Sequence, residues 1–466
     1  MTSRAALSIA LSALFVVVLL IGLWNARRAR SVSDFHLAGG TLGAFRAALS
    51  QAAGAYGLWI LIGVSGAAYT LGLAAVWMCA GVLAGASLTW FYVGPTIHRQ
   101  ARAAGATTAF ELLSRPGRMD SSRSIPQSAA GIAAVAVFFG VCAQLSIAGG
   151  AVARVLAIQH ATAVAIVASA TLIGALLGGL RAISAIAALC ALLVAAIALF
   201  LALPPLLFLE GMAGLWSALA STGEFALDPL GGYVGSQAVL SVLGAFGIGL
   251  GLCGQPQLID QFIATRSEQN VRWAGVIAIA WFALVLLSML LLGWSARALY
   301  ESIGSGDVVI FEVVQRILPP ALLALPVIAI VAAVIACLGA QLVVVSGALV
   351  LLRSRDDAGQ PTVLRLRTAV LLAGGAAAAI AALAHFDSAR VALLCWLATA
   401  AVLGPLLLVR ASGVQVRPGY AAAAMRIGIV LTLLLFVLRR ERTEWLAAVL
   451  PFTAALAVAV LGRERN

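Results

Sequence analysis

The side chains that most often do chemistry in proteins are sparse in this sequence and form no convergent pattern. Six cysteines (79, 142, 190, 253, 337 and 395) are scattered through apolar stretches without a CxxC pair, which is typical of small buried hydrophobes rather than of metal ligands. The four histidines, at 36, 98, 160 and 385, share no ligand spacing. With no Ser–His–Asp arrangement and no phosphate-binding loop, we expect neither an enzyme nor an organic cofactor.

Clusters of glycine indicate instead that backbone N–H and C=O groups could take part in the function. Residues 50–66 read SQAAGAYGLWILIGVSG, and residues 243–256 read LGAFGIGLGLCGQP, where the proline cannot continue a helix. Two interpretations stay open. The glycines can allow close packing between membrane helices. Alternatively, they interrupt the helices, and the freed N–H and C=O groups must then meet a ligand, an ion, water or side chains.

Composition indicates which elements carry these glycines. Of the 466 residues, 63% are hydrophobic and only 10% are charged, with a mean hydropathy of +1.08. Repeated apolar runs of roughly 20 residues predict a polytopic, all-α membrane protein. We expect about 13 transmembrane helices.

The charges predict how these helices are oriented. The net charge of +12 arises from 29 basic residues, all of them arginines, and most lie in alternate loops. The positive-inside rule then places the N-terminus outside and the C-terminus inside a bacterial-type inner (plasma) membrane. No basic face accompanies the charge, so the expected partners are the lipid bilayer and a small-molecule solute, with no nucleic acid. The oligomeric state is left open.

The two glycine-rich segments fall in the second and seventh expected spans, five spans apart. If spans 2–6 and 7–11 are two repeats, each has an odd number of crossings, and the second enters the membrane in the opposite sense. Interrupted helices at matching places in inverted halves are the best sequence indication of a secondary transporter's binding site. This spacing favours the interrupted-helix interpretation.

Several tracts carry a more specific pattern. They are SDFHLAGGTLGAFRAALS at 33–50 with its continuation QAAGAYGLWILIGVSGAAYTLG, ATTAFELLSR at 106–115, GGLRAIS at 178–184, LGLCGQPQLIDQFIAT at 250–265 and LGAQLVVVSG at 338–347. In order and spacing they resemble the sodium:solute symporter family, particularly its proline-transporter branch. The resemblance implies a LeuT-type fold of five-plus-five inverted repeats. It divides the chain into an extra N-terminal helix and loop at 1–40, a first repeat at 41–210, a second repeat at 211–415 and a C-terminal helix pair at 416–466.

The resemblance also implies where a sodium ion would bind. The family couples uptake of a small organic solute to sodium entry. The implied backbone-carbonyl ligands are Ala53 and Tyr56, with Ala333 opposite, and the usual hydroxyl ligands correspond to Ala336 and Cys337. Because sodium needs about five or six oxygen ligands and sulfur is a poor replacement, the sodium site is expected to be eroded.

Two carboxylates usual near this site are replaced as well, by Ala55 and Ala187. Gln144 and Gln341 are read either as interhelical hydrogen-bonding residues or as part of the solute pathway. Asp260 is either a solvated helix-end residue or a proton carrier. The residues expected to bind the solute are Gly54, Ala55, Gly57, Leu58, Gly140, Gly247, Ile248 and Gly251.

The sequence thus predicts a secondary transporter that moves a small organic solute, an amino acid such as proline or a carboxylate, by alternating access. Sodium coupling is what the resemblance implies. The alternative is a transporter-like membrane sensor or partner subunit that does not transport.

Overall fold

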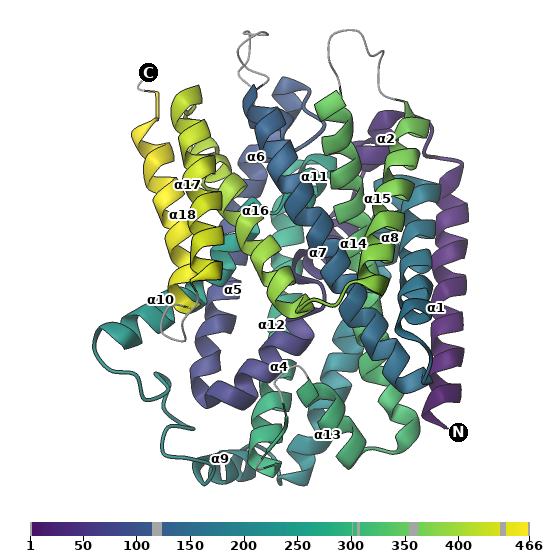
Figure 1. Ribbon diagram of the computed structural model, residues 1–466, viewed down its shortest axis with the longest axis vertical. Coiled ribbons are helices and arrows are strands. Elements are labelled where there is room, and N and C mark those ends of the chain that lie inside the picture. The colour runs from purple at the N-terminus through teal and green to yellow at the C-terminus, as the bar shows by residue number, and fades with distance from the viewer. Residues whose placement is uncertain are drawn as a thin grey trace.

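The computed structural model describes residues 2–113, 124–300, 302–304, 308–353, 362–438 and 444–464, and every regular element within these ranges is a helix (Figure 1). The last two residues of the tract at 106–115 lie outside them. The α-helices are α1 (Ser3–Ala26), α2 (Val32–Leu37), α3 (Ala44–Tyr56), α4 (Trp59–Leu71), α5 (Val76–Leu88), α6 (Gly94–Ala104), α7 (Ser124–Leu156), α8 (His160–Phe208), α9 (Met212–Ala220), α10 (Ser236–Leu250), α11 (Pro256–Ala264), α12 (Glu268–Leu299), α13 (Val309–Ile317), α14 (Ala324–Arg353), α15 (Val363–Leu383), α16 (Ser388–Ala411), α17 (Pro418–Val437) and α18 (Glu444–Leu461).

Ten helical stretches in the described ranges are long and apolar enough to cross a membrane, and α18 is a shorter apolar helix. One stretch, α8, holds two of the expected spans. Within it, Gly179 has φ 54° and ψ −150°, a conformation that glycine adopts more readily than other residues. The chain reverses direction at this residue. A Cβ on Gly174 would lie 2.7 Å from Ile186, whereas a continuous helix would separate these two residues by about 18 Å.

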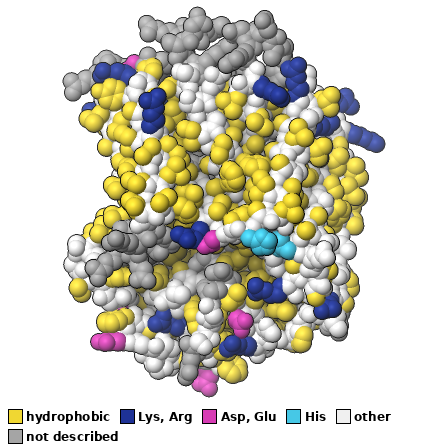
Figure 2. All heavy atoms as spheres, in the orientation of Figure 1, with side chains coloured by type: hydrophobic (Ala, Val, Ile, Leu, Met, Phe, Trp, Pro, Cys, Tyr) yellow, Lys and Arg dark blue, Asp and Glu magenta, His cyan; other side chains and the backbone are white. Residues whose placement is uncertain are grey.

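Apolar side chains cover the middle of the molecule. Figure 2 shows a broad band of hydrophobic side chains, with most of the visible charged residues near its edges or beyond it. On α1 the exposed apolar side chains include Val16, Leu20 and Trp24, which are 51%, 60% and 72% exposed. Surfaces of this kind are stable against lipid hydrocarbon. The chain is therefore a multi-pass membrane protein, as the sequence predicts.

Helix α14 forms the centre of the fold and packs against α8, α7 and α3. Helix α1 lies along the outside of α8, and the pair α17 and α18 packs on α16 and α10. The two chain termini lie at opposite ends of the molecule (Figure 1). We call the end that holds Arg27, Arg28 and Arg30 after α1, Arg102 in α6 and Arg410 in α16 the arginine-rich end.

Both glycine-rich segments are interrupted helices. Helix α3 ends at Tyr56 and α4 begins at Trp59, with Gly57 at φ 55° and ψ −135° between them. Helix α10 is followed by a 3₁₀ turn at Gly251–Gly254 and an extended Gln255 before α11 begins. The first residue of α11 is a proline, which suits this position because its missing N–H would have no helical partner.

The packing interpretation also holds for part of the second segment. A Cβ on Gly249 of α10 would collide with the carbonyl of Gly81 on α5, and one on Gly85 would collide with the carbonyl of Gly249. We call this contact, formed by Gly81, Gly85 and Gly249, the α5–α10 seam. The two backbones touch directly there, so the same glycine run both weakens α10 and packs it.

Candidate solute-binding site

At the first break, α3 loses the hydrogen-bond partners that a continuing helix would supply. One of its carbonyls is met by a side chain, because the Cys337 thiol of α14 donates to the backbone oxygen of Gly54 at 3.1 Å. Gly57 packs against Cys337 and against Oε1 of Gln144, with which a Cβ would collide. Glycine is therefore required there both by its backbone angles and by its neighbours.

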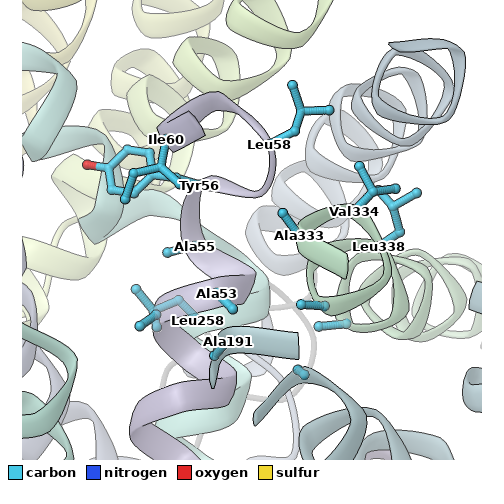
Figure 3. Packing of buried hydrophobic residues seen from close by; sticks show 14 of the residues in the cluster. Ala53, Ala55, Tyr56, Leu58, Ile60, Ala191, Leu258, Ala333, Val334 and Leu338 are labelled. Atoms are coloured by element: carbon cyan, nitrogen blue, oxygen red, sulfur yellow. The ribbon is translucent and has the colours of Figure 1, made fainter. Parts of the chain in front are cut away.

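The second break lies beside the first. Tyr56 Oη donates to the carbonyl oxygen of Ile248 at 3.4 Å, and Ser50 Oγ donates to Oε1 of Gln261 at 2.6 Å. Figure 3 shows Leu258 of α11 next to α3. Two segments about 200 residues apart in the sequence thus meet inside the molecule, as an inverted-repeat transporter site requires.

A cavity of about 530 Å³ opens beside the two breaks and is walled by α7, α14 and α16 as well. One wall is aromatic: the rings of Tyr56 and Trp396 stack with centroids 4.7 Å apart, and Trp59 lies 5.4 Å from Tyr56. The exposed Asp387 and Arg390 also line the cavity and pair with each other at 3.8 Å. Cavities of this volume hold small organic molecules.

Four polar side chains form two hydrogen-bonded pairs along the cavity. Gln144 Nε2 donates to Oε1 of Gln341 at 3.2 Å. Thr399 Oγ1 donates to Oε1 of Gln255 at 3.2 Å, and Gln255 Nε2 donates to the carbonyl of Trp396 at 3.3 Å. These pairs connect α7 to α14 and the second break to α16.

Two buried polar atoms that belong to the cavity walls have no hydrogen-bond partner among the described residues. They are Oε1 of Gln144, which faces Gly57 at the first break, and Nε1 of Trp396, which faces Gly251 at the second. An unpaired buried acceptor or donor costs about 1–3 kcal/mol. A bound solute or water that supplies the missing donor and acceptor removes this cost.

Of the residues expected to bind solute, some line the cavity and others pack behind the lining residues. Gly54 and Gly57 lie at the first break behind the lining residues, and Gly251 lies under the indole of Trp396. Gly247 instead packs against Val449 of α18 and faces away from the cavity. The predicted residues that line the cavity are Ala55, Leu58, Gly140 and Ile248.

The positions implied for sodium lie together on two neighbouring helices. Figure 3 shows α3, with Ala53 and Tyr56, running beside α14, with Ala333. Ala336 has no hydroxyl, and the Cys337 thiol is already bonded to the backbone of α3. Within the described ranges, no three His, Cys, Asp or Glu side chains converge on a possible metal site.

The sequence predicted that the span now seen as α16 helps to wall the site, but it did not single out Trp396 and Thr399 on that helix or the amide of Gln255 at the second break. Trp396 and Thr399 line the cavity from α16, and Gln255 lines it between the 3₁₀ turn and α11. The available signal was polarity: an indole and a hydroxyl inside an apolar span, and an amide directly before Pro256. A polar group within a membrane span has to find a partner, and that partner is often the site.

The cavity is closed at the arginine-rich end. The chain before α3 pairs with the chain after α11, since Leu42 N–H donates to the carbonyl of Ala264 at 3.2 Å and Arg266 N–H donates to the carbonyl of Leu42 at 2.9 Å. Burial lowers the pKa of His36, in the short helix α2 that precedes this pairing, to about 4, so the imidazole is uncharged at neutral pH.

Asp260 is part of this closure rather than a solvated helix end. Its side chain is buried, with 4% exposure, and Oδ1 accepts the N–H of Ala109 at 2.6 Å. The carboxylate therefore fastens the segment after α6 to α11.

Solved transporters share this architecture. A Na⁺-coupled sialic acid symporter superposes with a TM-score of 0.82 at 15% identity, covering 99% of both chains. The transporter MhsT in complex with L-phenylalanine has a TM-score of 0.58 at 15% identity, covering 90% of this chain and 98% of the other. The fold and the paired helix breaks are those of the LeuT-type membrane transporters.

The sequence comparisons identify the family. Residues 35–433 match the model of the sodium:solute symporter family. The high-affinity proline transporter of Bacillus subtilis is 27% identical over 348 residues, which are 72% of this chain and 70% of that protein. A sodium/proline symporter of Salmonella typhimurium is 26% identical over 430 residues, or 89% and 84% of the two chains. The chain belongs to the sodium:solute symporter family, as the resemblance predicted.

Proposed function

We propose that this protein moves a small organic solute across the plasma membrane by alternating access around the cavity beside the two helix breaks. The observation that carries this proposal is the meeting of two interrupted helices at a cavity that is closed at one end. Opening the pairing between Leu42 and Ala264 while Trp59 and Trp396 close over the solute would release it at the arginine-rich end.

The proposed solute is compact and has no net charge, as a zwitterionic amino acid has. The cavity is lined by aromatic rings, amides and a hydroxyl, and its exposed Asp387 and Arg390 neutralise each other. Helix α4 begins without a side-chain cap, so its free N–H groups and positive dipole end suit a carboxylate. The carbonyls that end α3 suit an ammonium group.

Proline is the proposed amino acid. The two relatives described above are proline transporters by name, and the flat wall formed by Tyr56 and Trp396 offers a surface for a pyrrolidine ring.

For the driving ion, we propose that sodium binds this chain weakly. The family is named for sodium coupling, but the oxygens left at the site are mainly backbone carbonyls. The thiol of Cys337 is a soft ligand that a hard cation disfavours, and it already occupies the Gly54 carbonyl. The same observation favours the second candidate function, a transporter-like sensor or partner subunit that does not transport.

Uptake by purified protein in liposomes tests both candidates. We expect saturable uptake of labelled proline or a related neutral amino acid that changes little when the sodium gradient is removed. Trp396→Ala should abolish uptake, whereas Trp273→Ala, which removes an indole that is 57% exposed on α12, should not. Absence of uptake across amino acids and carboxylates by protein with an intact melting transition would support the non-transporting alternative.

A further inference from the structure

A separate hollow, of about 400 Å³, lies where α1, α3 and α8 meet and shares no lining residue with the solute cavity. It is at the arginine-rich end and on the outer surface, because α1 forms an edge of the molecule (Figure 1). We call it the α1 groove. Its lining residues are Leu20, Ile21, Trp24, Asn25 and Arg28 of α1, Arg46 of α3 and Ala185 of α8.

The α1 groove carries positive charge that the protein does not neutralise. Arg46 is half-buried; its Nε donates to Ser184 Oγ at 3.0 Å and its Nη2 donates to the carbonyl of Arg181. Arg28 is exposed. In the part of the chain that the structure describes, neither guanidinium has a carboxylate oxygen within 4.0 Å.

The carboxylate of Asp34 in α2 does not compensate for this charge, because it has another partner. Asp34 is paired with Arg181, with an N···O distance of 3.7 Å. Arg181 is itself close enough to Arg46 to act on it as a like charge. An anion in the groove would therefore relieve a repulsion between guanidiniums as well as satisfy their N–H groups.

The apolar wall of the groove continues into the surface that faces lipid. Leu20 and Trp24 are 60% and 72% exposed on α1, and a tryptophan near the end of a membrane helix belongs at the level of the lipid headgroups. The groove thus has guanidinium groups at headgroup level and an apolar face toward the hydrocarbon. A soluble anion matches only the first of these features.

We propose that the α1 groove binds an anionic phospholipid of the leaflet at the arginine-rich end, with its phosphate held by Arg28 and Arg46 and an acyl chain along Leu20 and Trp24. Basic pockets between transmembrane helices on the cytoplasmic side are suited to such headgroups. Since Arg46 belongs to the inner half of the first interrupted helix and Arg28 follows α1, the lipid links the peripheral helix to a helix of the solute site.

Native mass spectrometry and melting of the full-length protein in detergent test this proposal without any transport assay, so the result is independent of the proposed function. Phosphatidylglycerol should stay bound and raise the melting temperature, whereas phosphatidylcholine should do neither. Arg28→Gln breaks no side-chain hydrogen bond of the described structure, and we expect it to weaken phosphatidylglycerol binding about fivefold. Arg353→Gln, which removes an exposed arginine of α14 outside the groove, should leave binding unchanged.

Arg46→Gln should weaken binding to a similar degree, and Arg46→Lys, which keeps the charge, should retain most of it. The melting temperature of each variant in phosphatidylcholine shows whether it is folded. Equal binding of both lipids, or unchanged binding by Arg28→Gln and a folded Arg46→Gln, would overturn the proposal. Equal stabilisation by inorganic phosphate would also overturn it, because the groove would then be a site for soluble anions.

Discussion

Cys337 donates its thiol to the carbonyl of Gly54 at the position where the family implies a sodium ligand. The first helix break therefore has a partner for that carbonyl within the protein itself. Backbone oxygens at membrane depth need such a partner whether or not an ion is present. At the scale of the residue, the hydrogen bond from Cys337 fastens the end of α3 to α14.

Restoring the oxygens should restore an ion response. The double variant Ala336→Ser, Cys337→Thr places two hydroxyls beside the carbonyls of α3. At a sodium concentration about five times the dissociation constant, sodium should then stabilise the fold by about 1 kcal/mol. Melting temperatures in sodium chloride and in choline chloride measure this difference.

The control for this experiment is Cys79→Ser, which introduces a hydroxyl on α5 away from the breaks and should show no sodium dependence. If the double variant melts at the same temperature in both salts, Ala336 and Cys337 are not the ion-ligand positions.

Gly57 is the second residue whose identity the site requires. Gly57→Ala forces a side chain into φ 55°, with a backbone strain of about 1–3 kcal/mol, and pushes its Cβ against Gln144 and Cys337. We expect a lower melting temperature and loss of solute binding. Gly150→Ala on α7, where nothing lies within 4 Å of the added Cβ, should instead be neutral or stabilise the protein by up to about 1 kcal/mol. Similar melting temperatures for the two variants would contradict the geometry of the break.

At the scale of the element, the second break depends on its bonds to α16. Thr399→Val removes the hydroxyl that donates to Gln255 at 3.2 Å and should reduce solute affinity about fivefold, the equivalent of one ordinary hydrogen bond. Isothermal titration with the transported solute measures this change. Thr432→Val removes a buried hydroxyl of α17 that bonds only within its own helix, and should leave affinity unchanged; equal losses in both variants would mean that Thr399 acts only through stability.

The closure at the arginine-rich end depends on Asp260. Asp260→Leu leaves the N–H of Ala109 without its acceptor, so amide hydrogen exchange across residues 106–113 should accelerate by about tenfold or more. Hydrogen exchange followed by mass spectrometry measures it. Glu268→Gln alters a partly exposed carboxylate at the same end that pairs with Arg99 and Arg272; comparable acceleration in this variant would show that Asp260 has no special role.

Much of the element level could be predicted from the sequence, because hydropathy identifies spans and glycine followed by proline identifies a break. The interruptions at Gly57 and Gly251–Gly254 follow from local backbone preferences that a sequence displays. The direction that each glycine faces could not be predicted. Gly247 packs on α18 and Gly251 packs on Trp396, and this depends on the rotation of α10, which its neighbours set.

For the cavity, too, one part of the lining could be predicted from the sequence and another part could not. Positions near the breaks, such as Ala55 and Ile248, could be predicted from their place in the sequence. Trp396 and Thr399 come from a helix more than 140 residues further along, and their approach to Gln255 is a tertiary contact with no local signature. Identical glycine runs can serve packing or binding, and only their surroundings distinguish the two.

At the scale of the whole molecule, the arginine-rich end should face the cytoplasm. Arginine keeps its charge at any physiological pH, and the positive-inside rule acts on loops of this kind. A green fluorescent protein fused after residue 466 should therefore fluoresce, and alkaline phosphatase fused at the same place should be inactive. The opposite pair of results would reverse the orientation and would place the closed end of the cavity outside.

The α5–α10 seam determines which parts of the transporter can move separately. The backbones of α5 and α10 touch through Gly81, Gly85 and Gly249, so no layer of side chains lies between the two helices to allow them to slide past each other. When α10, the outer half of the second interrupted helix, tilts, we expect α5 to move with it. The conformational change is then a joint movement of α5 and α10 rather than a movement of α10 alone. Spectroscopic labels on α5 and α10 should keep a constant separation through the whole cycle, while the separation of either from α16 changes.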